Sequence, residues 1–132
     1  MAHRAPGGRF GGGAAFWAGL GNGALAERLE AWIAKAPFAV ASTAPDHPRF
    51  DRRRYWRGPI WAVVNFMIGE GLEESGHAAL ARRIGADTRR LIETAGFFEY
   101  FDPLDGAGLG GRHFTWTAAM WLAWAGRQDP VP

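Results

Sequence analysis

The apolar stretch at residues 60–72 constrains the fold more than any other part of the sequence. Its helical periodicity leaves almost no polar face, because large aliphatic and aromatic residues occupy nearly every position. A helix that is apolar all round is buried on every side. Pro59 suits the first turn of this helix, and Gly69 and Gly71 would let a neighbour approach closely. The stretch therefore predicts a helix enclosed by other helices.

Three further helices follow from the 3.6-residue period of apolar positions. One spans about residues 24–35, with Asn22 as its cap and Pro37 as its stop. A second, at residues 77–93, is amphipathic and ends at Gly96. A last helix, capped by Thr115, runs to about residue 125. Its expected inward residues are Trp116, Ala119, Met120 and Ala123. The end of a short helix is also expected within residues 14–20.

Buried and amphipathic helices alternate along the chain, which predicts an all-α fold of two layers, an inner ring covered by an outer one. About four helices are too few to close such a ring, so the sequence is interpreted as part of a larger assembly. Residues 1–13 are expected to be a flexible Gly-rich lead-in and residues 127–132 a tail, with the domain segment at 14–126. The long connection at residues 36–54 is expected to be functional or misassigned.

Composition excludes several classes of function. The 132 residues suit one domain, and a net charge of +2 is too small to indicate a nucleic-acid partner. The sequence has no cysteine, so disulfides and thiolate metal sites are ruled out, and a cytoplasmic location is expected. No apolar run reaches membrane-spanning length, so no membrane partner is expected. The apolar segment after Arg9 is interrupted by Gly and Asn and is interpreted as non-targeting.

Residues 96–116 (GFFEYFDPLDGAGLGGRHFTW) place one carboxylate, Glu99, among four aromatic rings. A loop of this kind would place the carboxylate in a site lined by aromatic rings. Desolvation there would raise the pKa of Glu99 into the range of a proton-transfer group. The alternative that the loop alone leaves open is a connection whose rings fill a core while Glu99 points to water. Asp102 and Asp105 are interpreted as turn residues.

The second distinctive loop, YWRGPIW at residues 55–61, also precedes an inward-facing helix, so both loops are expected to open at one end of the helical layers. Trp56, Trp61 and Trp116 could stack on sugar rings, although core packing is at least as good an interpretation for Trp61. Asn65 must find a hydrogen bond, and joining two helices is the preferred role over reaching the site. The histidines lack metal-ligand spacing, so no metal site is predicted.

Two segments together resemble a known family: RRRYWRGPIWAVVNFMI at residues 52–68, and DTRRLIETAGFFEYFDPLDGAGLGGRHFTWTAAMWLAWA at residues 87–125. They are similar to the carboxy-terminal portion of mannosylglycerate and glucosylglycerate hydrolases, which belong with glycoside hydrolase family 63 and are related to trehalases. The resemblance covers residues 14–126 and follows the order YWRGPxW, GFxEYFDP, a Gly-rich turn and F-[ST]-W-T.

The resemblance implies an (α/α)6 barrel of six inner and six outer helices, incomplete in this chain, in an enzyme that cleaves glycosidic bonds with inversion. No cofactor is expected. It assigns Glu99 as the general base. The positions that it assigns to the sugar site are Tyr55, Trp56, Gly58, Trp61 and Trp116. The family's general acid is an aspartate upstream of this region, which neither Asp51, Glu70 nor Glu73 matches. The chain is therefore expected to be a fragment that is inactive alone.

A second class of function stays open, a non-catalytic helical module that binds a sugar or a protein through the same aromatic residues. For either class, the side left uncovered by missing helices is expected to expose apolar surface, mainly from the helix at residues 60–72. Apolar patches beyond a few hundred Å² are uncommon on stable monomers, so self-association is expected.

Overall fold

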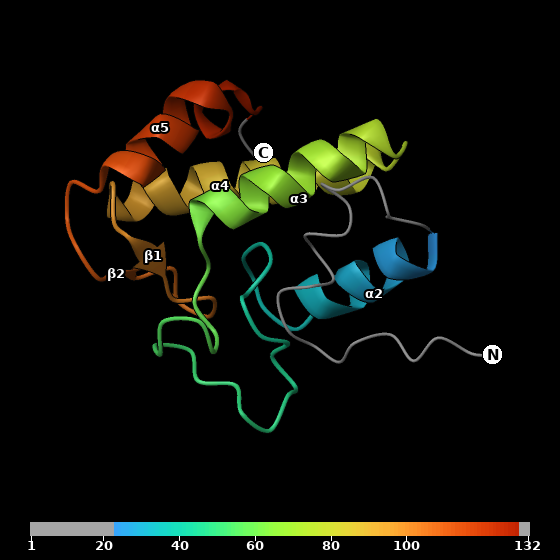
Figure 1. Cartoon of the computed structure of the whole chain (residues 1–132), viewed down its shortest axis with the longest axis horizontal. Helices are drawn as coiled ribbons and strands as arrows, with labels where there is room; N and C mark the ends of the chain where they lie inside the picture. Colours follow the sequence, from blue (N-terminus) through green and yellow to red (C-terminus); the bar gives the residue numbers. More distant parts are fainter. Residues whose placement is uncertain (1–22, 130–132) are drawn as a thin grey trace.

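The computed structural model describes residues 23–129. Its helices are α2 (Gly23–Ile33), α3 (Ala62–Glu74), α4 (Ala78–Ala95), α5 (Thr115–Ala123) and the 3-10 turn η1 (Ala125–Arg127), and its strands are β1 (Tyr100–Phe101) and β2 (Gly108–Leu109). The predicted lead-in, the helix end at residues 14–20 and the Asn22 cap lie outside the described residues. The described part is rich in helix, as the sequence predicts (Figure 1).

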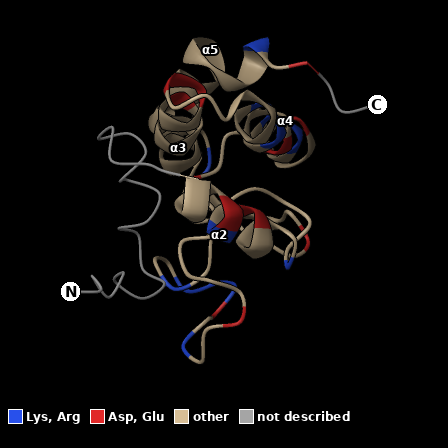
Figure 2. Ribbon diagram, turned by 90° about the vertical axis from the view of Figure 1, so that its right-hand side faces the viewer, with Lys and Arg blue, Asp and Glu red and all other residues tan. Residues whose placement is uncertain are grey.

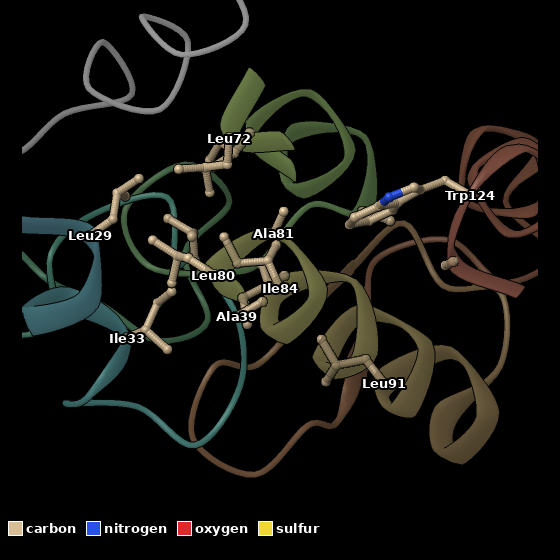
Figure 3. Close-up of a cluster of buried hydrophobic side chains, with 14 of the residues drawn as sticks. Leu29, Ile33, Ala39, Leu72, Leu80, Ala81, Ile84, Leu91 and Trp124 are labelled. Carbon is tan, nitrogen blue, oxygen red and sulfur yellow. The ribbon is translucent and has the colours of Figure 1, made fainter. Parts of the chain in front are cut away.

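Helices α3 and α4 lie side by side and form the centre of the structure. Seen nearly end-on in Figure 2, they have α5 on one side and α2 on the other. Apolar side chains from α2, α3 and α4 converge between these elements, among them Leu29, Leu72, Leu80 and Ile84 (Figure 3). The predicted close approach at Gly69 is confirmed, because a Cβ atom there would lie 2.6 Å from Cζ2 of Trp124.

Several predicted helix ends are wrong by a few residues. Helix α3 begins at Ala62, because Ile60 pairs instead with Phe101 through two backbone hydrogen bonds of 2.8 and 2.9 Å. Thr115 is the first residue of α5 and makes no capping hydrogen bond. Gly96 does end α4, with a φ of 97° that glycine adopts without strain. No described helix is long and apolar enough to cross a membrane.

The expected burial of two helices is also wrong. In α3, Val63, Val64, Phe66 and Met67 keep part of their surface exposed, because the neighbouring helices α4 and α5 do not enclose the helix completely. In α5, Thr117 is the one buried residue, so the predicted inward face is largely open to solvent. Trp116 is 50% exposed and Leu122 72% exposed. Exposed apolar surface is therefore present as expected, but α5 supplies more of it than α3.

The loop after α4 contains a small antiparallel hairpin that an all-helical prediction does not include. Tyr100 pairs with Leu109, and Phe101 pairs with Gly108. Strands of two residues are too short to give a periodic signal in the sequence. The hairpin, together with the bridge from Phe101 to Ile60, brings the end of the acidic loop against the chain that enters α3.

The connection between α2 and α3 is a true loop whose middle is buried. Residues 39–43 are all buried. The Oδ1 atom of Asn65 accepts a hydrogen bond from the backbone N–H of Val40 at 3.2 Å, so this buried amide joins α3 to the connection rather than to a second helix. Farther along, Ser42 and Thr43 bond to the YWRGPIW loop, which makes the connection a support for that loop.

Candidate active site

The two distinctive loops meet at the side chain of Glu99. The hydroxyl of Tyr55 donates a hydrogen bond of 2.9 Å to Oε1 of Glu99. The backbone N–H of Gly111 donates one of 3.2 Å to Oε2, and the Glu99 N–H returns a bond of 3.0 Å to the Gly111 carbonyl. One carboxylate oxygen is thus held by the YWRGPIW loop and the other by the loop that contains Glu99 itself, which fixes the orientation of the carboxylate.

Aromatic rings form a continuous stack beside this carboxylate. Trp56 and Trp61 stack with centroids 4.0 Å apart and planes 16° from parallel, and Tyr100 stacks on Trp61 at 5.1 Å. The ring of Tyr55 is nearly perpendicular to those of Trp56, Trp61 and Tyr100, and the indole N–H of Trp61 donates a hydrogen bond to the Tyr55 carbonyl. Trp61 is buried, whereas Trp56 keeps 41% of its surface exposed. The stack therefore has one outer ring available to a ligand.

A narrow crevice, smaller than a sugar ring, opens next to Glu99. Its lining residues are Trp61, Ala62, Val63, Glu99, Phe114, Trp116 and Thr117. The crevice brings together three of the sequence-predicted site residues, Glu99, Trp61 and Trp116. Tyr55 touches Glu99, and Trp56 lies behind Trp61 in the stack. Gly58 does not line the crevice: a Cβ there would run into the backbone of Asp51, so this glycine lets the loop close on itself.

The Gly-rich turn at residues 106–111 leaves the space that the Glu99 side chain occupies. Gly110 has a φ of 73°, and a Cβ at this position would lie 2.6 Å from Oε2 of Glu99. A side chain there would be strained and would also displace the carboxylate. Two more bonds, from the Phe114 N–H to the Phe97 carbonyl at 2.8 Å and from the Thr117 hydroxyl to the Phe98 carbonyl at 2.6 Å, fix the start of α5. Trp116 is placed beside the crevice by these contacts.

Polar groups as well as aromatic rings surround Glu99. Glu99 is half-buried, and of the four rings that flank it in sequence, Phe97 is exposed and Phe101 is fully buried in the core. The polar contacts to Tyr55 and Gly111 are the main neighbours of the carboxylate. The hydrogen bond to Glu99 raises the pKa of Tyr55 above its usual value of 10.0, because a donor to a carboxylate resists losing its proton.

Sequence reasoning missed a charged cluster behind the site. Asp102 is fully buried, and its Oδ2 accepts hydrogen bonds from Nε of Arg52 at 2.6 Å and Nε of Arg53 at 3.2 Å. Asp105 pairs with the same two arginines. The backbone N–H of Ala107 and the charge of Arg52 lower the pKa of Asp105, and Asp102 raises the pKa of Arg52. The basic triplet at residues 52–54 was the one available signal, because fifty positions separate Arg52 from Asp102.

The turn interpretation of both aspartates is confirmed alongside these ion pairs. Oδ1 of Asp102 accepts from the N–H of Leu104 at 2.9 Å, and Oδ1 of Asp105 accepts from that of Ala107 at 2.9 Å. Within residues 23–129, no group of three or more His, Asp or Glu side chains could hold a metal ion.

Comparison with known proteins identifies the family. Residues 14–117 match the model of the mannosylglycerate hydrolase MGH1-like glycoside hydrolase domain. The chain belongs to this family. It is 44% identical over 112 residues to mannosylglycerate hydrolase MGH1 of Selaginella moellendorffii, covering 82% of this chain and 23% of the relative. It is 49% identical over 100 residues to mannosylglycerate hydrolase of Thermus thermophilus, covering 76% of this chain and 24% of that protein.

Solved structures of the family agree. The crystal structure of a glycoside hydrolase family 63 mannosylglycerate hydrolase from Thermus thermophilus, in complex with glucose, superposes with a TM-score of 0.77 at 44% identity. The aligned region covers 81% of this chain and 27% of that one. A complex of the same enzyme with Tris and D-glycerate gives a TM-score of 0.76. The chain thus spans about a quarter of the length of the mannosylglycerate hydrolases it matches.

Proposed function

We propose that this chain supplies the general base and one wall of the sugar site in an inverting hydrolase of small glycosylated acids, of the mannosylglycerate or glucosylglycerate type. The observation that carries the proposal is the position and hydrogen bonding of the Glu99 carboxylate. This carboxylate borders a crevice beside Trp61 and Trp116, and Tyr55 and Gly111 hold it in one orientation. Relatives named mannosylglycerate hydrolase and, at 36% identity, glucosylglycerate hydrolase support the substrate class.

Inverting hydrolysis requires two carboxyl groups on opposite sides of the scissile bond. A carboxylate base activates water, while a carboxylic acid protonates the leaving oxygen. Glu99 is the single acidic residue among the described residues that line the crevice. It has a free lone pair on each oxygen beyond the bonds to Tyr55 and Gly111, so it can still accept a proton from water. We assign the acid to a part of the complete protein outside residues 23–129.

We place α3 and α5 in the inner ring of the proposed barrel and α4 in its outer ring. Both α3 and α5 follow directly on a loop of the site, and both leave apolar surface uncovered. Further inner helices packed on that surface would deepen the narrow crevice into a pocket of sugar size. In such a pocket, Trp56 and Trp116 would offer their exposed ring surface to the sugar. Gly58 would act through the shape of the loop, and Trp61 as the support for Trp56.

The test uses the full-length protein and a pair of matched variants. Glu99→Gln keeps the shape of the side chain and removes the proton acceptor, so substrate should still bind while turnover falls by at least about 10²-fold. Glu74→Gln makes the same change on an exposed residue at the end of α3, away from the crevice, and should leave turnover unchanged. Proton NMR of the released sugar should show the inverted anomer first.

Each outcome of this test has a distinct meaning. Turnover by Glu99→Gln equal to that of Glu74→Gln would show that Glu99 is not the base. Retention of the anomeric configuration would exclude the single-displacement mechanism. If the wild-type full-length protein bound the sugar saturably but did not hydrolyse it, this result would instead favour the non-catalytic binding module.

A further inference from the structure

Asp102 is a buried carboxylate that the proposed chemistry does not use. It lies three residues after Glu99, is fully buried, and faces away from the crevice lining into the loop at residues 51–57. Burying a charge is costly unless it is paired and hydrogen-bonded. Its Oδ2 meets this requirement through Arg52 and Arg53, and its Oδ1 through the N–H of Leu104. The loop that contains Tyr55 therefore supplies the two positive charges that pair with Asp102, a residue of the Glu99 loop.

The loop at residues 51–57 is closed tightly enough to transmit this anchoring to Tyr55. Its ends are joined by a bond from the Asp51 N–H to the Arg57 carbonyl at 2.7 Å. The Arg57 N–H bonds to the Arg54 carbonyl at 2.6 Å, and the Arg54 N–H to the Asp51 carbonyl at 3.1 Å. The position of Arg52 in so small a ring determines where the backbone of Tyr55 can lie.

Tyr55 itself has a backbone conformation that needs external support. Its φ is 29°, in the left-handed region that a tyrosine rarely adopts. A strained residue of this kind persists only where the surrounding structure over-determines it. Here the supports are the Trp61 N–H on its carbonyl, the Glu99 carboxylate on its hydroxyl, and the arginines two and three positions earlier in the chain.

We infer that Asp102 is a positioning residue for the base: through Arg52 and Arg53 it holds the loop at residues 51–57 so that the Tyr55 hydroxyl fixes the Glu99 carboxylate. The inference rests on the proposed role of Glu99 as base. It adds a chain of contacts, from Asp102 through the arginines and Tyr55 to Glu99, that returns to Asp102 along only three residues of backbone. Loss of any contact in this closed chain would leave the Gly111 N–H as the one remaining hydrogen-bond donor of this site to the carboxylate.

Arg52→Gln tests the inference most cleanly, with Arg54→Gln as its matched control. Both variants lose one positive charge from the same triplet, but Arg54 is exposed and makes no side-chain hydrogen bond or ion pair with the described residues. The first readout is a tyrosinate absorbance titration of this chain, which has two tyrosines. Subtraction of the Tyr55→Phe titration isolates Tyr55, and circular dichroism at each pH verifies folding.

The sign of the shift separates positioning from a simple charge effect. Loss of a nearby positive charge by itself would raise the pKa of Tyr55, because the tyrosinate would be less stabilised. Loss of the hydrogen bond to Glu99 would lower that pKa toward 10.0. We expect a fall in Arg52→Gln and in Arg53→Gln, and none in Arg54→Gln. Asp102→Asn should also show a fall, but loss of its negative charge would by itself lower the pKa of Tyr55, so the arginine variants decide.

The second readout is turnover by the full-length protein. Arg52→Gln should lower kcat by about tenfold or more with a smaller change in KM, because the base is displaced while the sugar wall stays in place. Arg54→Gln should retain wild-type kcat. The inference would be overturned if Arg52→Gln folded and showed the same pKa of Tyr55 and the same kcat as Arg54→Gln. A wild-type protein without turnover would refute the proposed function, while the titration would still decide the positioning role.

Discussion

The hydroxyl of Tyr55 lies 2.9 Å from Oε1 of Glu99, across 44 positions of sequence. The contact joins the YWRGPIW loop to the acidic loop and gives Tyr55 a role that sugar stacking alone does not require. With Gly111 bonded to the other oxygen, this hydroxyl fixes the orientation of the Glu99 carboxylate beside the crevice. Tyr55 thus orients the carboxylate that we propose as the base.

Tyr55→Phe should therefore impair turnover without unfolding the full-length protein. A hydrogen bond to a charged group contributes about 1.5–3 kcal/mol, so we expect kcat to fall roughly 10- to 100-fold. Tyr100→Phe also removes a tyrosine hydroxyl while it keeps the ring that stacks on Trp61, and its loss should be smaller. Steady-state kinetics on mannosylglycerate and glucosylglycerate provide the comparison. Equal losses in the two variants would argue against the orienting role.

The isolated 132-residue chain should show no measurable hydrolysis of mannosylglycerate, glucosylglycerate or trehalose. General acid catalysis alone contributes about 10²–10⁴-fold, and the crevice is too narrow to enclose and orient a sugar. Product release by the purified chain, measured beside the full-length protein, checks this expectation. Turnover by the bare chain that survives Glu99→Gln would contradict both the assigned base and the need for a second segment.

Gly69→Ala should destabilise the chain although alanine favours helix by about 1 kcal/mol. The added methyl group would lie 2.6 Å from the Trp124 ring, and overpacking of this kind costs about 1–3 kcal/mol. The midpoint of urea unfolding should fall. In a Trp124→Leu background the ring is gone, so the same substitution should become neutral or stabilising. A loss of equal size in both backgrounds would show that the contact is not the cause.

Acid should weaken the chain partly through Asp105. Its pKa is lowered in the folded state, so its contribution to stability is present above the ordinary value of 3.8 and is lost as the pH falls through the folded-state pKa. The melting temperature of Asp105→Asn should therefore depend less on pH below about pH 4 than that of the wild type. Glu74→Gln, which removes an exposed carboxylate without an ion pair to the described residues, should retain the wild-type profile.

Self-association of the isolated chain should depend on α5. Leu122 is 72% exposed on a helix that buries only Thr117, so Leu122→Glu should shift the chain toward monomer in sedimentation velocity. Ala79→Glu adds the same charge to an exposed position in the first turn of α4 and should leave the association state unchanged. Association that responds equally to both substitutions would reflect net charge rather than the α5 surface.

The sequence predicted the elements with long apolar periods and failed where partners are distant or elements are short. The helical character of residues 62–74 and 78–95 was evident, and Gly96 marked the end of α4 correctly. The hairpin at Tyr100 was not predictable, because two residues have no period. Burial of α5 was overestimated, because the apolar pattern of a helix indicates which face can be buried. It does not indicate whether another segment of this chain packs on that face.

The sequence predicted three of the residues that line the crevice, but not the contacts that hold them. Glu99, Trp61 and Trp116 meet at one crevice, which the order of loops and helices already indicated. The arginine pairs of Asp102 could not be read from spacing, because they join segments fifty residues apart. The rings next to Glu99 in sequence are not all its neighbours in space. Phe97 is exposed and Phe101 is buried in the core, whereas Trp61, which lines the crevice with Glu99, comes from the other loop.

The buried middle of the connection between α2 and α3 limits how this protein can be recombined with its relatives. A stretch without helix or extended strand is the usual choice for a junction between halves of two homologues. Here residues 39–43 pack inside, Val40 is bonded to Asn65 of α3, and Ser42 holds the N–H of Gly58. A junction within this stretch would combine a connection from one parent with a YWRGPIW loop from another. The chimera would inherit both halves of the site and lose the fit between them.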